Sequence, residues 1–122
     1  MRKFKFAGAC FAFLSVALGA FVSHFLKSYL DLQELNAFQT GIRYMMYHGL
    51  AILILSGLEI PKNIFIFRLF FWGTILFSFS IFILSLQKFF SKDLSFLGPI
   101  TPLGGTLLIL GWIVLILRIL KK

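Results

Sequence analysis

The chain has 122 residues, of which 60% are hydrophobic and 13% are charged, and its formal net charge is +8. A soluble domain of this length cannot bury so much apolar surface, because small domains leave a large fraction of their surface in water. The composition therefore excludes an ordinary soluble enzyme and predicts a membrane protein. Nucleic-acid binding is excluded as well, because the basic residues flank apolar runs and form no contiguous patch.

Four apolar runs are long enough to cross the hydrocarbon core as helices, which takes about 20 residues at roughly 1.5 Å of rise each. None of them alternates polar and apolar residues as a barrel strand would. The sequence therefore predicts an all-α fold: a four-transmembrane-helix bundle that forms a single integral membrane domain over residues 1–122. The spans are expected at about 4–26, 41–58, 64–86 and 103–120.

The first run begins with basic residues, as a cleaved secretory signal would, but its apolar stretch continues to Leu26. That length exceeds a typical signal core, so we expect a retained first span. Small residues recur along it every three or four positions, on one side of the helix, where another helix can approach closely or a second copy can associate. This stripe consists of Gly8, Ala12, Ser15, Gly19 and Ser23.

The segment SYLDLQELNAFQT follows the first span. Asp31 and Glu34 have the spacing of a capping box, which marks the start of a helix. Apolar residues then recur at helical spacing. The pattern favours a short amphipathic interfacial helix between spans one and two. A plain loop is the alternative.

The stretch RYMMYHGL opens the second span. If this helix begins near Gly41, Arg43 and Tyr44 fall at the outer interface, where both residue types anchor helices. Tyr47 lies one turn from Arg43 and can stack under its guanidinium. His48 then lies seven residues in, roughly 10 Å below the surface.

Two interpretations of His48 follow. An ionisable residue inside the membrane is a functional candidate, and His24 at the outer end of span one is expected nearby. The favoured interpretation is a neutral imidazole hydrogen-bonded between helices. Two histidines without nearby carboxylates or thiols are half a metal site, so we predict neither metal nor cofactor. Asp31, Glu34 and Asp93 fall in loops, so we expect no catalytic residues and no enzyme.

The fourth span is preceded by LGPITPLGG. Thr101 is suited to the N-cap and Pro102 to the first helical position. The simpler interpretation is a tight turn into the span. The alternative is that the free backbone N–H groups of this helix start, up to Gly104 and Gly105, bind an anion.

The basic residues predict the orientation, because four spans place both termini and the middle loop on one side. That side carries eight of the twelve: Arg2, Lys3, Lys5, Lys62, Arg68, Arg118, Lys121 and Lys122. The other side carries Lys27, Arg43, Lys88 and Lys92. The positive-inside rule then places both termini in the cytoplasm.

The segments GAFVSHFLK, TGIRYMMYHGLAILI, LFSFSIFIL and LGPITPLGGTLLILGW resemble, in this order, the YgdD/YwdK-type family of small four-helix membrane proteins, an uncharacterised family with a domain of unknown function. The resemblance implies four transmembrane helices in the bacterial inner membrane, and no established reaction. It matches the family at His24, Arg43, Tyr47, His48, Ser78, Thr101, Pro102, Gly104, Gly105, Gly111 and Trp112. Val22 and Ser23 replace the family's Gly-Ala pair, and Met45 replaces a glutamine.

Two functional hypotheses result. The first is a non-enzymatic accessory or membrane-maintenance protein, whose partners are the lipid bilayer and either a second copy or another membrane protein. The second is a small binding or transport bundle for a lipid head group or small anion. Its outer-half cluster would comprise His24, Arg43, Tyr47, His48, Thr101, Gly104 and Gly105. Arg43 would hold the charge, His48 would donate or shuttle a proton, and the helix start would supply N–H donors.

Overall fold

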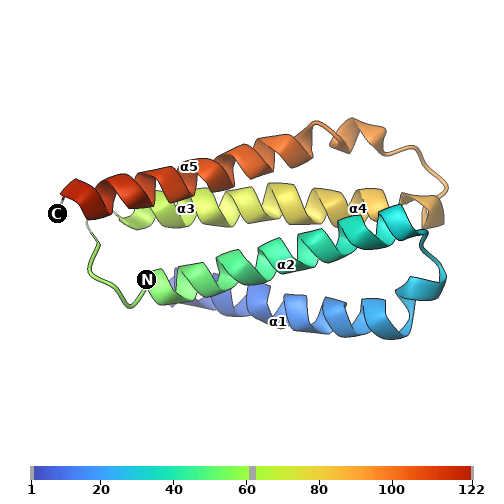
Figure 1. Cartoon of the computed structure of the whole chain (residues 1–122), viewed down its shortest axis with the longest axis horizontal. Coiled ribbons are helices and arrows are strands. Elements are labelled where there is room, and N and C mark those ends of the chain that lie inside the picture. The colour runs from blue at the N-terminus through green and yellow to red at the C-terminus, as the bar shows by residue number, and fades with distance from the viewer. Residues whose placement is uncertain (1, 61–62, 122) are drawn as a thin grey trace.

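The computed structural model describes residues 2–60 and 63–121, and over these ranges the chain is all-helical, without strands. Four helical rods lie along the long axis of the molecule (Figure 1). They are α1 (Arg2–His24), α2 (Leu32–Leu55), a composite rod of α3 (Asn63–Thr74), η2 (Ile75–Phe79) and α4 (Ser80–Ser85), and α5 (Ile100–Lys121). Short 3₁₀ turns lie in the connections: η1 (Leu26–Ser28), η3 (Gln87–Phe89) and η4 (Ser95–Leu97).

Three helical stretches in the described part of the chain are long and apolar enough to cross a membrane: Arg2–His24, Asn63–Ser85 and Ser95–Lys121. They correspond to the predicted first, third and fourth spans. The second predicted span overlaps the later part of α2, which has 24 residues and ends at Leu55 but is not among the three. Its first turns carry polar residues such as Gln33, Glu34 and Asn36.

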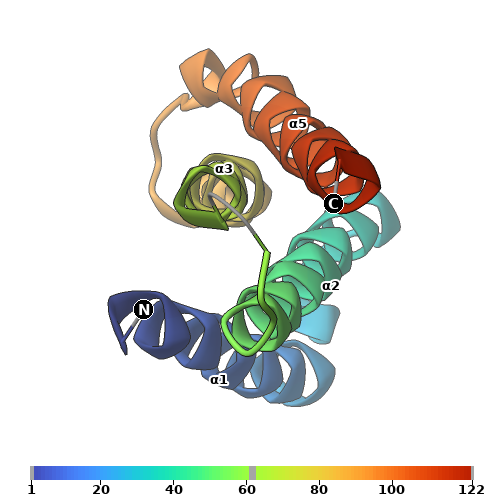
Figure 2. The ribbon, with the colours of Figure 1, turned by 90° about the vertical axis from the view of Figure 1, so that its left-hand side faces the viewer.

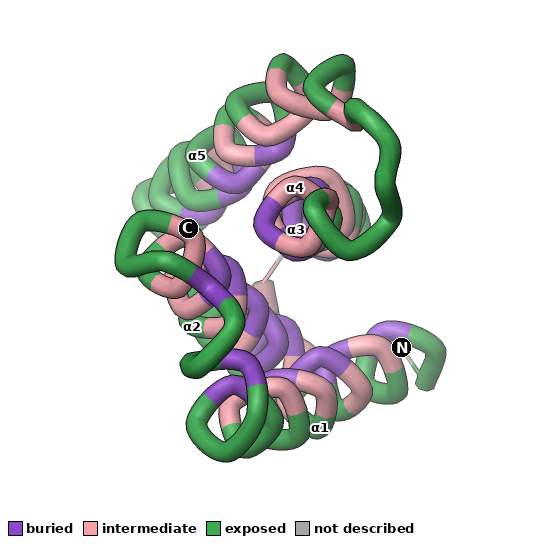
Figure 3. The backbone as a smooth tube through the Cα atoms, turned by 90° about the vertical axis from the view of Figure 1, so that its right-hand side faces the viewer, coloured by how far each residue is buried: buried purple, intermediate pink, exposed green. Residues whose placement is uncertain are grey.

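Successive rods run in opposite directions, so both ends of the chain lie at one end of the bundle, beside the connection from α2 to α3 (Figure 1). Viewed from that end, α1 packs on α2, and α5 packs on α3 (Figure 2). Lys62 and Lys122, which the orientation argument included, lie outside the described residues. Buried positions face the interior, and many outward positions are exposed (Figure 3). The outer surface includes large apolar side chains such as Phe6 and Phe13, as expected for contact with lipid.

The start of α2 differs from the prediction. The capping box itself is confirmed: the Glu34 backbone N–H donates to Asp31 Oδ1 at 2.8 Å, and the Asp31 N–H donates to Glu34 Oε1 at 3.0 Å. The helix that starts at this cap continues without a break to Leu55. Residues 32–40 are therefore the first turns of α2, and no separate interfacial helix forms.

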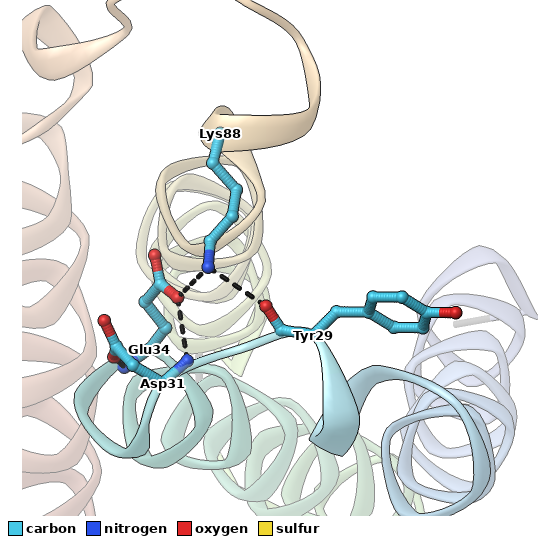
Figure 4. Close-up of polar contacts among 4 residues, drawn as sticks. All are labelled: Tyr29, Asp31, Glu34 and Lys88. Carbon is cyan, nitrogen blue, oxygen red and sulfur yellow. Dashed lines mark hydrogen bonds and ion pairs between the residues drawn. The ribbon is translucent and has the colours of Figure 1, made fainter.

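An ion pair joins two segments of the bundle at the end where α2 starts (Figure 4). Lys88 Nζ lies 2.7 Å from Glu34 Oε1 and donates to the backbone oxygen of Tyr29 at 3.0 Å. The contact connects the segment after α4 to the corner between α1 and α2. Because both side chains are partly exposed, the ion pair contributes at most about 1 kcal/mol.

The composite rod contains a π-helical turn, η2, between α3 and α4. Such turns widen a helix locally and often occur at functional positions. The turn packs against two glycines of other helices. Ser78 Oγ donates to the backbone oxygen of Gly41 in α2 at 2.8 Å, and Gly104 of α5 lies against the backbone of Leu76 and Phe77.

Replacing Ser78 with alanine should destabilise the protein by about 1 kcal/mol, because it removes a buried hydrogen bond between two helices. Thermal unfolding of the detergent-solubilised protein measures the effect. Thr106→Ala is the matched control, because the Thr106 hydroxyl donates to Pro102 within α5 and is exposed. Equal losses for the two variants would contradict an interhelical role for Ser78.

Only the first half of the small-residue stripe of α1 packs closely against another helix in the described part of the chain. A Cβ on Gly8 would lie 2.7 Å from the Gly49 oxygen of α2, and Ser15 is buried. By contrast, a Cβ on Gly19 would have no neighbour within 4 Å, and Ser23 is exposed. The close approach that the stripe predicts therefore occurs with α2 of the same chain.

Candidate functional site

His48 is buried, with 4% of its surface exposed, where α2 passes α5. Its Nδ1 lies 2.7 Å from the Tyr44 backbone oxygen, one turn earlier in α2. The indole Nε1–H of Trp112, in α5, donates to Nε2 at 3.0 Å. His48 therefore connects the two helices through its side chain.

These partners determine the protonation of the ring. A carbonyl oxygen only accepts and an indole N–H only donates, so Nδ1 carries the hydrogen and Nε2 carries the lone pair. The imidazole is neutral, and both of its nitrogens are used by the protein. This is the hydrogen bonding expected of an imidazole that packs between helices, and it leaves neither nitrogen for a substrate.

Aromatic rings surround His48. Phe70 lies edge-on to it with ring centroids 5.3 Å apart, and Phe70 is itself 4.8 Å from Trp112. Tyr44 packs on Phe77 of the π-helical turn, with centroids 4.8 Å apart. The rings of α2, α3, η2 and α5 thus form one continuous wall.

This wall bounds a cleft of about 580 Å³ between α2 and α5. We call it the α2–α5 cleft. Its lining is mostly apolar, and its polar groups are the phenols of two tyrosines, the His48 imidazole and the Trp112 indole N–H. The lining residues are Tyr44, Tyr47, His48, Phe77, Gly105, Leu108, Ile109 and Trp112.

A second cleft of about 330 Å³ continues between α2 and α5 toward the end that carries the termini. Tyr47 and Trp112 line both clefts. The hydrogen bond from Trp112 to His48 therefore lies where the two clefts meet. An apolar groove follows the α2–α5 flank of the bundle on both sides of this contact.

The structure brings together three of the seven candidate residues, since Tyr47, His48 and Gly105 line the α2–α5 cleft. Two more lie beside it. The Thr101 hydroxyl is 2.6 Å from the Ser80 hydroxyl, and Gly104 packs on η2. Because α5 begins at Ile100, Thr101 is already inside the helix and is not its N-cap.

His24 and Arg43 are not part of this group. Gly8 meets Gly49, so the antiparallel α1 carries His24 away from His48 by roughly 24 Å of helix. Arg43 lies on the exposed side of α2. Its guanidinium donates to Thr40 Oγ1 at 3.1 Å, toward the start of the helix.

The depth expected for His48 also changes. With α2 starting at Leu32, His48 is roughly 24 Å along the helix, beyond its middle, where the prediction placed it one-third of the way in. Trp112, the direct partner of His48, was absent from the candidate residues. The sequence held one signal for it, the Gly-Trp pair after ITPLGG.

Replacing Trp112 with phenylalanine should destabilise the protein by about 1–2 kcal/mol, because the buried Nε2 of His48 loses its donor while an aromatic ring remains against Phe70. The unfolding temperature in detergent measures the loss. Trp72→Phe is the control, because Trp72 lies on α3 and does not line the α2–α5 cleft, whereas Trp112 donates to His48. If both variants unfold alike, the indole N–H contributes nothing to joining α2 and α5.

An all-helical chain with three helices of this length and apolarity is an integral membrane protein of the helical-bundle class. Residues 18–105 match the family described as "Protein of unknown function (DUF423)". The chain belongs to this family, which confirms the resemblance.

Its relatives are uncharacterised membrane proteins that it matches over almost their whole length. It is 36% identical over 126 residues to the UPF0382 membrane protein YwdK of Bacillus subtilis, covering 99% of this chain and 98% of the relative. It is 38% identical over 124 residues to the UPF0382 membrane protein SAB0533 of Staphylococcus aureus, with the same coverage. It is 36% identical over 124 residues to SSP2132 of Staphylococcus saprophyticus, covering 99% of each. No solved structure matches the chain.

Proposed function

We propose that this protein crosses the bacterial cell (inner) membrane four times, with both termini in the cytoplasm. The packing of α1 against α2 supports α2 as the remaining span, because a neighbour that runs antiparallel along a membrane-spanning helix crosses with it. The polar first turns of α2 and the Glu34–Lys88 pair then lie at the outer surface. The excess of basic residues at the other end supports the orientation.

We further propose that the protein is a non-enzymatic accessory or membrane-maintenance protein that holds a lipid chain in the α2–α5 cleft. The cleft carries this proposal: its volume is typical of small-molecule sites, roughly 300–1,000 Å³, and its walls are aromatic and aliphatic. Inside a membrane, lipid is the abundant molecule that contacts such an apolar surface.

Two observations favour a binding role without catalysis. Both nitrogens of His48 are already hydrogen-bonded, so the imidazole lacks a free site to act as a general base. The three carboxylates weighed above as possible catalytic acids make other contacts. Asp31 and Glu34 cap α2, and Asp93 accepts hydrogen bonds from Ser95.

A lipid chain suits the cleft better than a head group or a small anion, the ligands of the second hypothesis. An anion needs a cation, and the proposed cation, Arg43, does not line the cleft. Gly104, one turn into α5, packs against the backbone of the π-helical turn, and the Thr101 hydroxyl is bonded to Ser80.

The test is to count lipids that remain bound after stringent delipidation, by native mass spectrometry of the purified protein. Gly105→Phe places a ring in the cleft and should remove one retained lipid. Ile116→Phe, also on α5 but outside the cleft, should leave the count unchanged. Equal lipid counts in the wild type and Gly105→Phe would refute binding in the cleft.

A further inference from the structure

A third cavity, separate from both clefts, lies between α1 and α3, near the end of the bundle that carries the termini. Its volume is about 240 Å³. Two aromatic stacks, Phe4 on Phe67 at 4.8 Å and Phe11 on Phe71 at 5.6 Å, hold the helices together around it. It shares no lining residue with the α2–α5 cleft. Its lining consists of Lys3, Phe4, Ala7, Arg68, Phe71 and Trp72.

Two positive charges border this cavity. Lys3 Nζ lies 5.5 Å from the centroid of the Phe4 ring, and Arg68 is exposed. Within residues 2–60 and 63–121, neither cation is paired with a carboxylate, and the ion pair between Glu34 and Lys88 lies at the opposite end. The protein therefore leaves a local positive potential at the cavity, which attracts an anion.

The lining changes from charged to apolar along the helices. Lys3 lies in the first turn of α1, and Arg68 lies five residues, roughly 7.5 Å, after the start of α3. This depth is suited to the head-group layer, because an arginine in hydrocarbon is costly. Phe71 and Trp72 lie about one turn deeper. Charged side chains therefore come first and aromatic rings lie deeper, an order that matches an amphiphile with an anionic head group.

We propose that this cavity binds the phosphate group of an anionic phospholipid in the leaflet on the side of the termini. The Arg68 guanidinium holds two phosphate oxygens through paired N–H donors, and Lys3 supplies a second positive charge. The first part of the acyl chain packs on Phe71 and Trp72. Free phosphate shares the head-group chemistry but gains nothing from the aromatic surface, so the phospholipid is the expected ligand.

The experiment compares phosphatidylglycerol with phosphatidylcholine of the same acyl chains, added to the purified full chain in neutral detergent, with bound lipid measured by native mass spectrometry. The wild type should prefer phosphatidylglycerol. In Lys3→Gln/Arg68→Gln the preference should fall roughly 30-fold, the scale expected for two basic residues at an anionic surface. Lys5→Gln/Lys121→Gln removes the same charge at the same end, outside the cavity, and should keep the preference.

Three outcomes would overturn the proposal. Equal losses in both double variants would indicate a general charge effect, and an absent preference in the wild type would indicate no site. Displacement of phosphatidylglycerol by inorganic phosphate alone would assign the cavity to the free ion. Unfolding temperatures show that each variant is folded. Gly105→Phe should leave this preference unchanged, so the two lipid proposals fail or survive separately.

Discussion

Replacing Gly104 with alanine should destabilise the bundle by about 3 kcal/mol, the upper range for adding one methyl group to a closely packed contact. A Cβ at this position would lie 2.3 Å from the Phe77 nitrogen and 2.8 Å from the Leu76 carbonyl carbon. Both are backbone atoms of the π-helical turn, which cannot move aside as a flexible side chain can. Because Ser78 of the same turn is bonded to Gly41, the displacement should also disturb α2.

Gly105→Ala is the matched control for this variant. Its Cβ would meet the Phe77 ring at 3.5 Å, an ordinary contact, and alanine has the higher helix propensity. The protein has one cysteine, Cys10, which is half-buried in α1, so its reaction with a thiol-specific dye during heating reports unfolding. Equal unfolding temperatures for Gly104→Ala and Gly105→Ala would mean that α5 does not approach η2 this closely.

The positions of the four helical rods could be predicted from the apolar runs, and seven of their eight boundaries agree within three residues. The start of the second rod could not be predicted from its apolar run. An apolar run shows which residues tolerate lipid, whereas a helix begins at its cap. Asp31 and Glu34 give that signal, but the polar residues after them differ so much from the apolar run that the pattern predicts a separate element. The cap and the apolar run belong to one helix, α2.

The π-helical turn has no signal in the sequence. The run LFSFSIFIL is compatible with a regular helix, and its apolar pattern does not indicate an extra residue in one turn. The turn is placed by its neighbours, since Gly104 lies against its backbone and Ser78 reaches Gly41. Such interhelical contacts depend on the packing of the whole bundle.

The candidate site could be predicted in part, for the same reason. His48 stands out as an ionisable side chain in an apolar run. Its partner Trp112 is 64 residues away, and only the register of α5 against α2 brings the indole to Nε2. His24 was expected nearby because span two was assumed to start at Gly41. The longer α2 moves His48 toward the other end of the bundle.

Replacing Gly49 with alanine should destabilise the protein by about 2–3 kcal/mol, because α1 and α2 touch here through their backbones. A Cβ on Gly49 would lie 2.9 Å from the Gly8 oxygen, 3.2 Å from the Ala12 nitrogen and 2.8 Å from the Phe11 Cβ. The helices can admit the methyl group only by separating. The dye reaction of Cys10 and the unfolding temperature measure the loss.

Gly19→Ala, on the open part of the same stripe, is the control and should leave stability unchanged. Gly8→Ala should cost as much as Gly49→Ala, and the double variant should cost less than their sum, because both methyl groups force apart the same contact. Additive losses would mean that the two glycines act separately. His48 directly precedes Gly49, so a displaced α2 should also weaken the Trp112 hydrogen bond. A change in the indole N–H resonance of Gly49→Ala, absent from Gly19→Ala, would connect this helix crossing to the α2–α5 cleft.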